Sequence, residues 1–463
     1  MKPTLIINHM SGGDDYVTPH VALVRRSNVV KYKEYDKTND YCTIEALEDG
    51  LTVTFHHNAV AYYSVDNCKT WVEMPEDSTT PPINTGEKIS FKQVGTNAGT
   101  FEVDKKFNLR GNAMSLIFGD EGKNNFDLTG YDGAFTATFI ICETLQSVSK
   151  NFLPATTLAD NCYCDMFNGC ISLVSAPELP ATELAPYCYG FMFYECTSLT
   201  TAPSLPATTL TYECYCNMFG SCISLVNAPQ LPATTLAEYC YQNMFVDCYS
   251  LVKAPALPAT TLVESCYMDM FTCCESLTTA PALPATELAP YCYSSMFGNC
   301  TSLVTAPELP ATELFECCYE YMFDGCTSLV SAPALPATTL AEGCYSYMFD
   351  GCTSLVSAPE LPATILKEHC YSYMFGHCNS LIDAPELPAT DLTTWCYRGM
   401  FSNCTSLNYI KALFTTEPSY SYTLEWVYNV SSTGTFVKSA DAAWDVRGDD
   451  AIPEGWTVET ASA

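Results

Sequence analysis

The tetrapeptide Leu-Pro-Ala-Thr recurs along this chain at a constant interval of 26 residues. It begins at residues 153, 179, 205, 231, 257, 283, 309, 335, 361 and 387. A fixed period of this length is typical of a solenoid, in which each unit buries its apolar side only by stacking on its neighbours. Ten units over residues 151–412 therefore predict one elongated array, whereas the length of 463 residues alone would suggest several globular domains.

The repeated unit has the pattern LPATxLxxxCYxxMFxxCxSLxxAPx, and seven of its positions, besides Leu-Pro-Ala-Thr and the constant serine, never vary. A stacked interior requires every layer to present the same shape to the next, so these positions are predicted to form the core. In the first unit they are Leu158, Cys162, Tyr163, Met166, Phe167, Cys170 and Leu173.

Two segments of the unit predict its secondary structure. The run from Leu173 to Pro180 resembles a short parallel strand, which its two prolines keep short because proline lacks a backbone N–H. Cys162 and Met166 have the i, i+4 spacing of a short helix or 3₁₀ turn. The predicted fold is a leucine-rich-repeat solenoid of short parallel β-strands and short helical turns.

The core of the unit resembles that of the BspA-like leucine-rich repeats of bacterial surface proteins. Their Ala-Phe-x-x-Cys-x-x-Leu core has its counterpart here in Met166-Phe167-x-x-Cys170-x-x-Leu173 and nine further copies. Met replaces Ala, and the unit is longer around Leu-Pro-Ala-Thr. The flanking segments and the long unit look more like repeat proteins of gut Bacteroidetes and their phages than like typical secreted adhesins of the BspA-like family. The resemblance covers residues 153–412 and implies the fold, but a fold alone does not imply a function.

Of the 27 cysteines, twenty occupy the two repeat positions represented by Cys162 and Cys170. A buried free cysteine packs as a small hydrophobic side chain, and we expect reduced core thiols at both positions. Partial disulfides and a metal site remain as alternatives. Two histidines, His369 and His377, flank Cys370 and Cys378, but two histidines in one repeat are more often surface variation than metal ligands. No cofactor and no metal are expected.

The regions outside the repeats predict three further parts. Residues 43–150 read as a β-sandwich-like domain, with alternating strands such as Leu51–Phe55 and Lys88–Lys92. Within it, Ser64-Val-Asp66-Asn-Cys68-Lys-Thr70-Trp71 resembles the Asp-box hairpin, with Cys68 in place of glycine, which implies a structural turn. Residues 1–42 are expected to be an arm that attaches to another chain, or an extra strand. Residues 413–463 are expected to cap the last coil.

The charge of the chain excludes several classes of partner. Residues 153–412 contain 24 acidic and 4 basic residues, and the whole chain has a formal charge of −32. Nucleic acids and anionic membranes are excluded because phosphate binding needs clustered Lys and Arg. The segment Met1–Met10 has too short an apolar run for a signal peptide, and no stretch approaches a membrane-spanning helix.

Between the constant positions, each unit contains positions that change, and Tyr, Asn, Ser, Gly, Asp and Glu dominate there. This composition is typical of binding loops, in which aromatic side chains supply rigid contact area. Free drift of exposed residues is the alternative. The polar ladder Ser175, Thr201, Asn227, Thr279 and Thr305 on the strand side is a second candidate surface. The predicted ligand-binding residues are Tyr187, Phe191, Tyr194, Tyr239, Tyr291, Tyr321, Tyr347, Tyr373, Trp395 and Arg398.

No catalytic motif is present, so an enzyme is not expected. The favoured function is adhesion: a bacteriophage tail or head fibre component, at the virion surface or otherwise extracellular, that recognises a glycan or protein of the host surface. Its N-terminal region would contact other virion proteins. A bacterial surface adhesin of the BspA-like type and a structural virion decoration protein are the alternatives. The oligomeric state is open.

Overall fold

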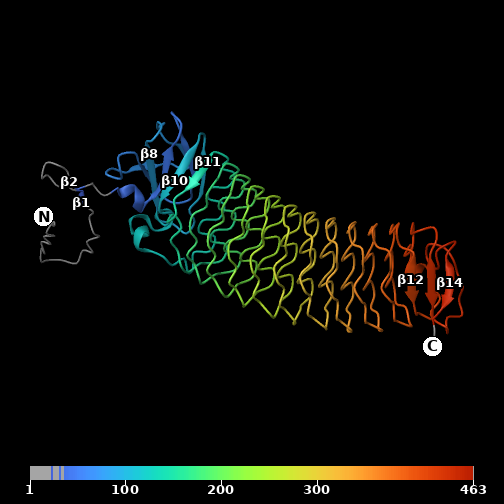
Figure 1. The fold of residues 1–463 in the computed structure, drawn as a ribbon. Helices are drawn as coiled ribbons and strands as arrows, with labels where there is room; N and C mark the ends of the chain where they lie inside the picture. The colour runs from blue at the N-terminus through green and yellow to red at the C-terminus, as the bar shows by residue number, and fades with distance from the viewer. Residues whose placement is uncertain (1–21, 24–30, 33–35, 462–463) are drawn as a thin grey trace, which may run out of the picture. The chain divides into compact units, whose positions relative to one another are not determined.

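The computed structural model describes residues 22–23, 31–32 and 36–461, and the chain forms two units, Met1–Lys37 and Thr38–Ala463. In the first unit, β1 (Ala22–Leu23) pairs antiparallel with β2 (Lys31–Tyr32). Most of the predicted attachment arm lies outside the described residues. All further features belong to the second unit, in which a β-sheet region leads into a long stack of coils (Figure 1).

Two sheets form the N-terminal part of this unit. One has the strand order β11-β10-β3-β8-β5-β6 and the other β7-β4-β9; β10 and β11 are parallel, and the other neighbours are antiparallel. Three short helical segments accompany them: η1 (Lys37–Asp40), α1 (Ser115–Phe118) and η2 (Gly119–Asn124). The strands are β3 (Cys42–Ala46), β4 (Val53–His56), β5 (Ala61–Ser64), β6 (Val72–Met74), β7 (Ser78–Thr79), β8 (Lys88–Gln93), β9 (Thr100–Val103), β10 (Phe107–Gly111) and β11 (Leu145–Val148).

An aromatic core joins the sheets to the coils. Phe55 and Phe101 of the smaller sheet stack at 4.1 Å, and both rings contact Phe91 of the larger sheet. Phe101 also stacks on Phe139 at 5.0 Å, and Phe139 stacks on Phe167 of the first repeat at 5.9 Å. One continuous apolar interior therefore runs from the sheets into the array.

The turn between β5 and β6 is built around the Asp66 carboxylate. The hydroxyls of Ser64 and Thr70 and the backbone N–H groups of Lys69 and Thr70 all donate hydrogen bonds to it. These donors hold the pKa of Asp66 well below its usual range. Cys68, which stands where the Asp-box pattern has glycine, has a φ of 59°. The carboxylate thus stabilises a hairpin turn.

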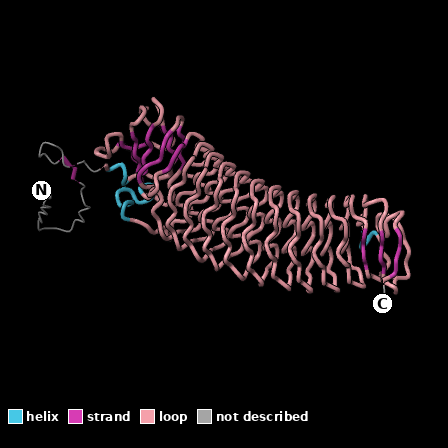
Figure 2. Tube along the Cα trace, viewed as in Figure 1, coloured by secondary structure: helices cyan, strands magenta, loops and turns pink. Residues whose placement is uncertain are grey.

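In each repeat, the segment predicted to be a short helix or 3₁₀ turn is a series of separate tight turns closed by i→i−3 hydrogen bonds, so the helix does not form and the turn does. Backbone N–H groups alternate in their partners: Tyr163 donates to Cys188 O of the next coil at 3.0 Å, and Cys164 donates to Asn161 O within its own turn at 3.1 Å. A helix would use every N–H within one coil and leave none to join neighbouring coils. Figure 2 accordingly shows the array as turns without helices.

The predicted strands shorten to single bridged residues. Ser175 and Thr201 form a parallel bridge, and the ladder continues through Asn227 and onward. Pro177 and Pro180, which follow Ser175, lack N–H donors and so prevent the ladder from extending beyond it. After the last repeat, where no proline follows the bridged residue directly, the four-residue strand β12 (Tyr409–Ala412) forms. The parallel direction is as expected, but the length is not.

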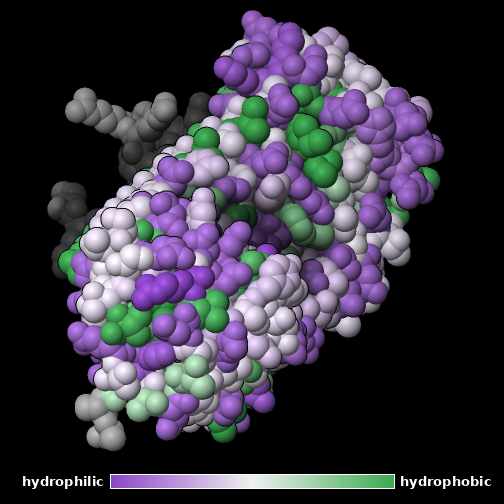
Figure 3. All heavy atoms as spheres, turned by 90° about the vertical axis from the view of Figure 1, so that its right-hand side faces the viewer, coloured by the Kyte–Doolittle hydropathy of each residue, from purple (hydrophilic) through white to green (hydrophobic). Residues whose placement is uncertain are grey.

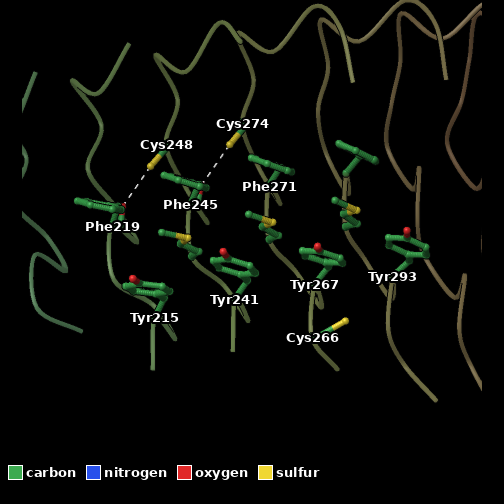
Figure 4. Close-up of a cluster of buried hydrophobic side chains, with 14 of the residues drawn as sticks. Tyr215, Phe219, Tyr241, Phe245, Cys248, Cys266, Tyr267, Phe271, Cys274 and Tyr293 are labelled. Carbon is green, nitrogen blue, oxygen red and sulfur yellow. Dashed lines mark hydrogen bonds between the residues drawn. The ribbon is translucent and has the colours of Figure 1, made fainter. Parts of the chain in front are cut away.

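The interior of the array is a pair of aromatic stacks, as the invariant positions predict. Tyr241 and Tyr267 are stacked at 5.7 Å with an interplanar angle of 5°, and Phe245 and Phe271 are stacked at 5.6 Å and 3° (Figure 4). All ten tyrosines and all ten phenylalanines of these columns are buried. The chain is therefore a repeat solenoid with a uniform core.

Both repeated cysteine columns are buried, and the second has a regular hydrogen bond. Cys248 Sγ donates to Phe219 O of the preceding coil at 3.2 Å, and Cys274 Sγ donates to Phe245 O at 3.2 Å (Figure 4). The same contact occurs for all ten members of the column. A small apolar side chain with a weak S–H donor suits this position, which explains cysteine there.

Coils without the Leu-Pro-Ala-Thr pattern close both ends of the array. Residues 125–150 form one such coil, from which Phe139 N–H donates to Met166 O at 3.0 Å. At the other end, the parallel strands β12, β13 (Thr435–Lys438) and β14 (Thr457–Thr460) and the turn α2 (Tyr420–Thr423) form the expected cap around the buried Trp426. From this end the surface is mostly hydrophilic, with small apolar groups (Figure 3).

No helix within the described residues is long and apolar enough to cross a membrane.

Candidate functional site

The turns of each repeat place every fourth residue at positive φ. Three columns of such residues begin at Asn161, Asp165 and Gly169 and run along the array, and we call the surface that they border the turn face. Gly, Asn and Asp tolerate positive φ with little cost. Part of the composition that resembles binding loops is thus explained by the backbone.

Aromatic side chains at these positions need another explanation. A left-handed conformation costs a residue with a Cβ roughly 1–2 kcal/mol, so bulky rings remain there only if their contacts or their function compensate. Eight of the ten predicted binding residues occupy the first two columns: Tyr187, Phe191, Tyr239, Tyr291, Tyr321, Tyr347, Tyr373 and Trp395. These eight residues therefore share one face of the coils, the turn face.

The predicted residues of the first half of the array form small separate groups. Tyr187 and Tyr239 both contact the exposed Tyr212 edge to face, at 5.4 and 5.7 Å. Phe191 and Tyr194 form a second pair at 5.8 Å. Sequence reasoning missed Tyr212, although a tyrosine two residues before the constant cysteine is a visible departure from the pattern.

Two of these tyrosines are engaged by carboxylates of the next coil. The Tyr239 hydroxyl donates to Glu264 at 3.0 Å, and the Tyr291 hydroxyl donates to Glu316 at 2.8 Å. These hydrogen bonds raise the pKa of both phenols. Their contacts within the protein account for both side chains without a ligand.

In the second half, three predicted residues form a continuous aromatic ladder. Tyr321 and Tyr347 stack at 4.5 Å and Tyr347 and Tyr373 at 4.8 Å, with interplanar angles of 13° and 7°. Each ring covers the face of the next, so the ladder presents ring edges and hydroxyls to its surroundings. A Cβ at Gly399, the next position of the column, would collide with the Tyr373 ring.

Arg398 and Trp395 continue the group beyond the ladder. The Arg398 guanidinium lies 5.7 Å from the Tyr373 ring centre and 5.3 Å from that of Trp395, within the range of cation–π attraction. Trp395 also contacts the His369 ring edge to face at 4.9 Å. Five predicted residues, Tyr321, Tyr347, Tyr373, Trp395 and Arg398, are thus brought together on neighbouring coils.

A hollow of about 270 Å³ lies beside this ladder. Small residues, namely Gly343, Ser346 and Ser372, line it together with Tyr347 and His369. Its lining also includes Cys317, Glu320, Glu342 and Arg398. Burial raises the pKa of the Glu320 carboxyl. The hollow therefore combines a cation, carboxylates, hydroxyls and an aromatic edge, which are groups suited to a polar ligand.

A polar network follows the third column. His377 Nδ1 lies 2.9 Å from Asp350 Oδ1, and His377 Nε2 lies 3.1 Å from the side-chain nitrogen of Asn403. Cys378, beside His377 in sequence, donates its thiol to Phe349 O. Within the described part of the chain, no group of three His, Cys, Asp or Glu side chains is placed to hold a metal ion.

Asp324, one coil before Asp350, is half-buried and belongs to none of the salt bridges of the described residues. Burial and the neighbouring Asp350 raise its pKa to about 6. Because the folded pKa exceeds the unfolded value, the contribution of Asp324 to stability is fully present below about pH 4 and is lost as the pH rises through about 6.

We expect Asp324→Asn to stabilise the chain at pH 7.5 by about 1 kcal/mol, after allowance for solvent screening, and to have little effect at pH 4. Thermal melts at several pH values would measure this. Glu308→Gln, which removes an exposed charge of the same array, controls for general repulsion. Equal gains in both variants at pH 7.5 would contradict the local origin of the effect.

No known protein family matches the chain, and no curated protein matches it. A solved structure, the TLR13–ssRNA13 complex, aligns with 66% of this chain at 12% identity and a TM-score of 0.22. The aligned part spans about half of that protein, 48% of its length.

Proposed function

We propose that this chain is a non-enzymatic binding protein whose turn face, at the ladder Tyr321–Tyr347–Tyr373 and its hollow, holds a ligand of a cell surface. The observation that supports it most is the placement of three stacked tyrosines at positive-φ positions. Asn217 and Asn243 fill the same column at lower backbone cost. Stacking returns about 0.5–1.5 kcal/mol per pair, so it offsets the strain without clearly exceeding it.

The solenoid architecture supports the same proposal. Stacked repeats create extended surfaces on a rigid scaffold, and recognition residues can vary on them while the core stays constant. The resemblance of the repeat core to BspA-like surface proteins favours adhesion to a host-surface glycan or protein. As part of this proposal, the chain belongs to a bacteriophage fibre; a bacterial surface adhesin and a decoration protein without a ligand are the alternatives.

The test is binding of the labelled full-length chain to Bacteroidetes cells, with and without their capsule. The double variant Tyr347→Asn/Tyr373→Asn should fold, because asparagine occurs at the same position in other units, and we expect it to bind at least tenfold more weakly. The matched control is Thr279→Ala/Thr305→Ala, on the ladder of bridged residues.

Saturable binding that the tyrosine variant loses and the threonine variant keeps would support the proposal. If the threonine variant loses binding instead, the site is on the bridged side. Absence of binding to every strain would leave decoration as the better explanation. Release of cleaved glycan during incubation would contradict a non-enzymatic role.

A further inference from the structure

Arg398 is an isolated cation in an acidic array. Residues 153–412 contain 24 acidic residues and only one arginine, yet the salt bridges of the described residues do not include Arg398. Its Nε is buried and has no hydrogen-bond partner within the described residues. No carboxylate of the described chain therefore pairs with this guanidinium, which leaves its charge available to an anion from outside.

Two aromatic rings border the guanidinium of Arg398. Those of Tyr373 and Trp395 lie within the range of cation–π attraction and favour its observed position. Because Nε is buried, a ligand reaches the guanidinium through its two Nη groups, which form the outer edge of the planar group and match the two oxygens of a carboxylate. Because Arg398 lines the hollow, an acceptor group of a ligand in the hollow can reach it.

The rest of the hollow limits the kind of anion. Glu320 and Glu342 line the same space, and the array around it has a formal charge of −20. Polyanions such as nucleic acids are repelled by this field. A ligand with a single negative group and several hydroxyls fits better, since hydroxyls donate to the glutamates and exchange hydrogen bonds with Ser346 and Ser372.

The size of the hollow favours one saccharide ring with its substituents. Its volume of about 270 Å³ lies just below the usual range of small-molecule sites, which begins at about 300 Å³. The tyrosine ladder, which begins at Tyr321, offers a row of phenol edges along which further sugars of a chain could extend.

Resting on the binding function proposed above, we infer that the hollow receives an acidic sugar residue of a surface glycan, whose carboxylate forms a paired hydrogen bond with Arg398. The hydroxyls of that sugar contact Glu320, Ser346 and Ser372, and the neutral sugars beside it follow the tyrosine ladder.

The experiment is titration of the full-length chain with oligosaccharides that end in glucuronic, galacturonic or N-acetylneuraminic acid. Each is compared with its methyl ester, which keeps the shape and removes the charge. We expect at least one acid to bind tenfold or more tightly than its ester. Arg398→Gln should reduce the acid to the level of the ester, and Arg398→Lys should recover only part of the difference.

The control is Lys367→Gln, which removes an exposed cation of the same array, and it should leave both affinities unchanged. Equal binding of acid and ester that still depends on Tyr347 and Tyr373 would overturn this inference while the proposed function stands. If every site variant still binds cells as the parent does, both this inference and the proposed function are overturned. Binding of none of the acids, or stronger Arg398-dependent binding of a sulfated sugar or an acidic peptide, would exclude the carboxylate sugar.

Discussion

Replacing Phe271 with alanine is expected to lower the free energy of unfolding of the array by about 3–5 kcal/mol. The Phe271 ring is fully buried between those of Phe245 and Phe297, at 5.6 and 5.7 Å. Backbone hydrogen bonds on both sides, such as Phe271 N–H to Met296 O, hold the coils at a fixed spacing. The neighbouring coils therefore cannot close over the cavity, and most of the cost remains.

The matched control is Tyr267→Phe in the adjacent stack. The Tyr267 hydroxyl is buried and has no hydrogen-bond partner within the described structure, so its removal should be neutral or slightly stabilising. Denaturant unfolding, followed by circular dichroism, would compare the two variants with the parent. A loss below about 1 kcal/mol for Phe271→Ala would show that coils can shift to fill a gap, contrary to a rigid stack.

The core was predictable because stacking imposes one shape on every layer. Met166, Phe167 and Cys170 are invariant between units for this reason, and all three are buried. The direction of the Cys170 thiol was not predictable. Its acceptor, Phe139 O, lies in a coil that lacks the repeat pattern, and side-chain hydrogen bonds do not follow from periodicity.

The sequence left a short helix and a 3₁₀ turn open at this segment because spacing alone cannot separate a helix from a series of turns. The i, i+4 spacing of Cys162 and Met166 fits both. The better signal is the Asn, Asp and Gly residues at every fourth position, as in Asn161, Asp165 and Gly169, because these residues favour positive φ. A helix would have no need for them.

From the sequence, only the face of the coils that carries the candidate site was predictable, and not the hollow itself. Residues 26 apart stack on neighbouring coils, so the ladder of Tyr321, Tyr347 and Tyr373 could have been identified from the period alone. The hollow could not, because Gly343 and Ser346 are small for several reasons that the sequence does not distinguish. That Arg398 is left without an acidic partner depends on side-chain directions, which only the structure gives.

Replacing Trp426 with alanine is expected to unravel the end of the array together with the candidate site. Trp426 is fully buried, lies 6.1 Å from Phe401, and donates its Nε1–H to Ala451 O at 2.9 Å. Loss of a buried tryptophan costs about 3–5 kcal/mol, and in a repeat array such a loss acts first on the nearest coils.

The coil of Trp426 is the one on which the Arg398 coil rests. Trp395 N–H donates to Ser421 O at 2.7 Å, and Phe401 N–H donates to Trp426 O at 2.8 Å. Trp426→Ala should therefore raise hydrogen exchange in residues 395–436 and weaken ligand binding, while residues around Phe271 keep their protection. Trp426→Phe, which retains most of the ring, should show a smaller effect in the same segment. Unchanged exchange at residues 395–412 would contradict this prediction. It would mean that the coil of Arg398 is stable without its cap and that the binding surface depends only on the repeats before it.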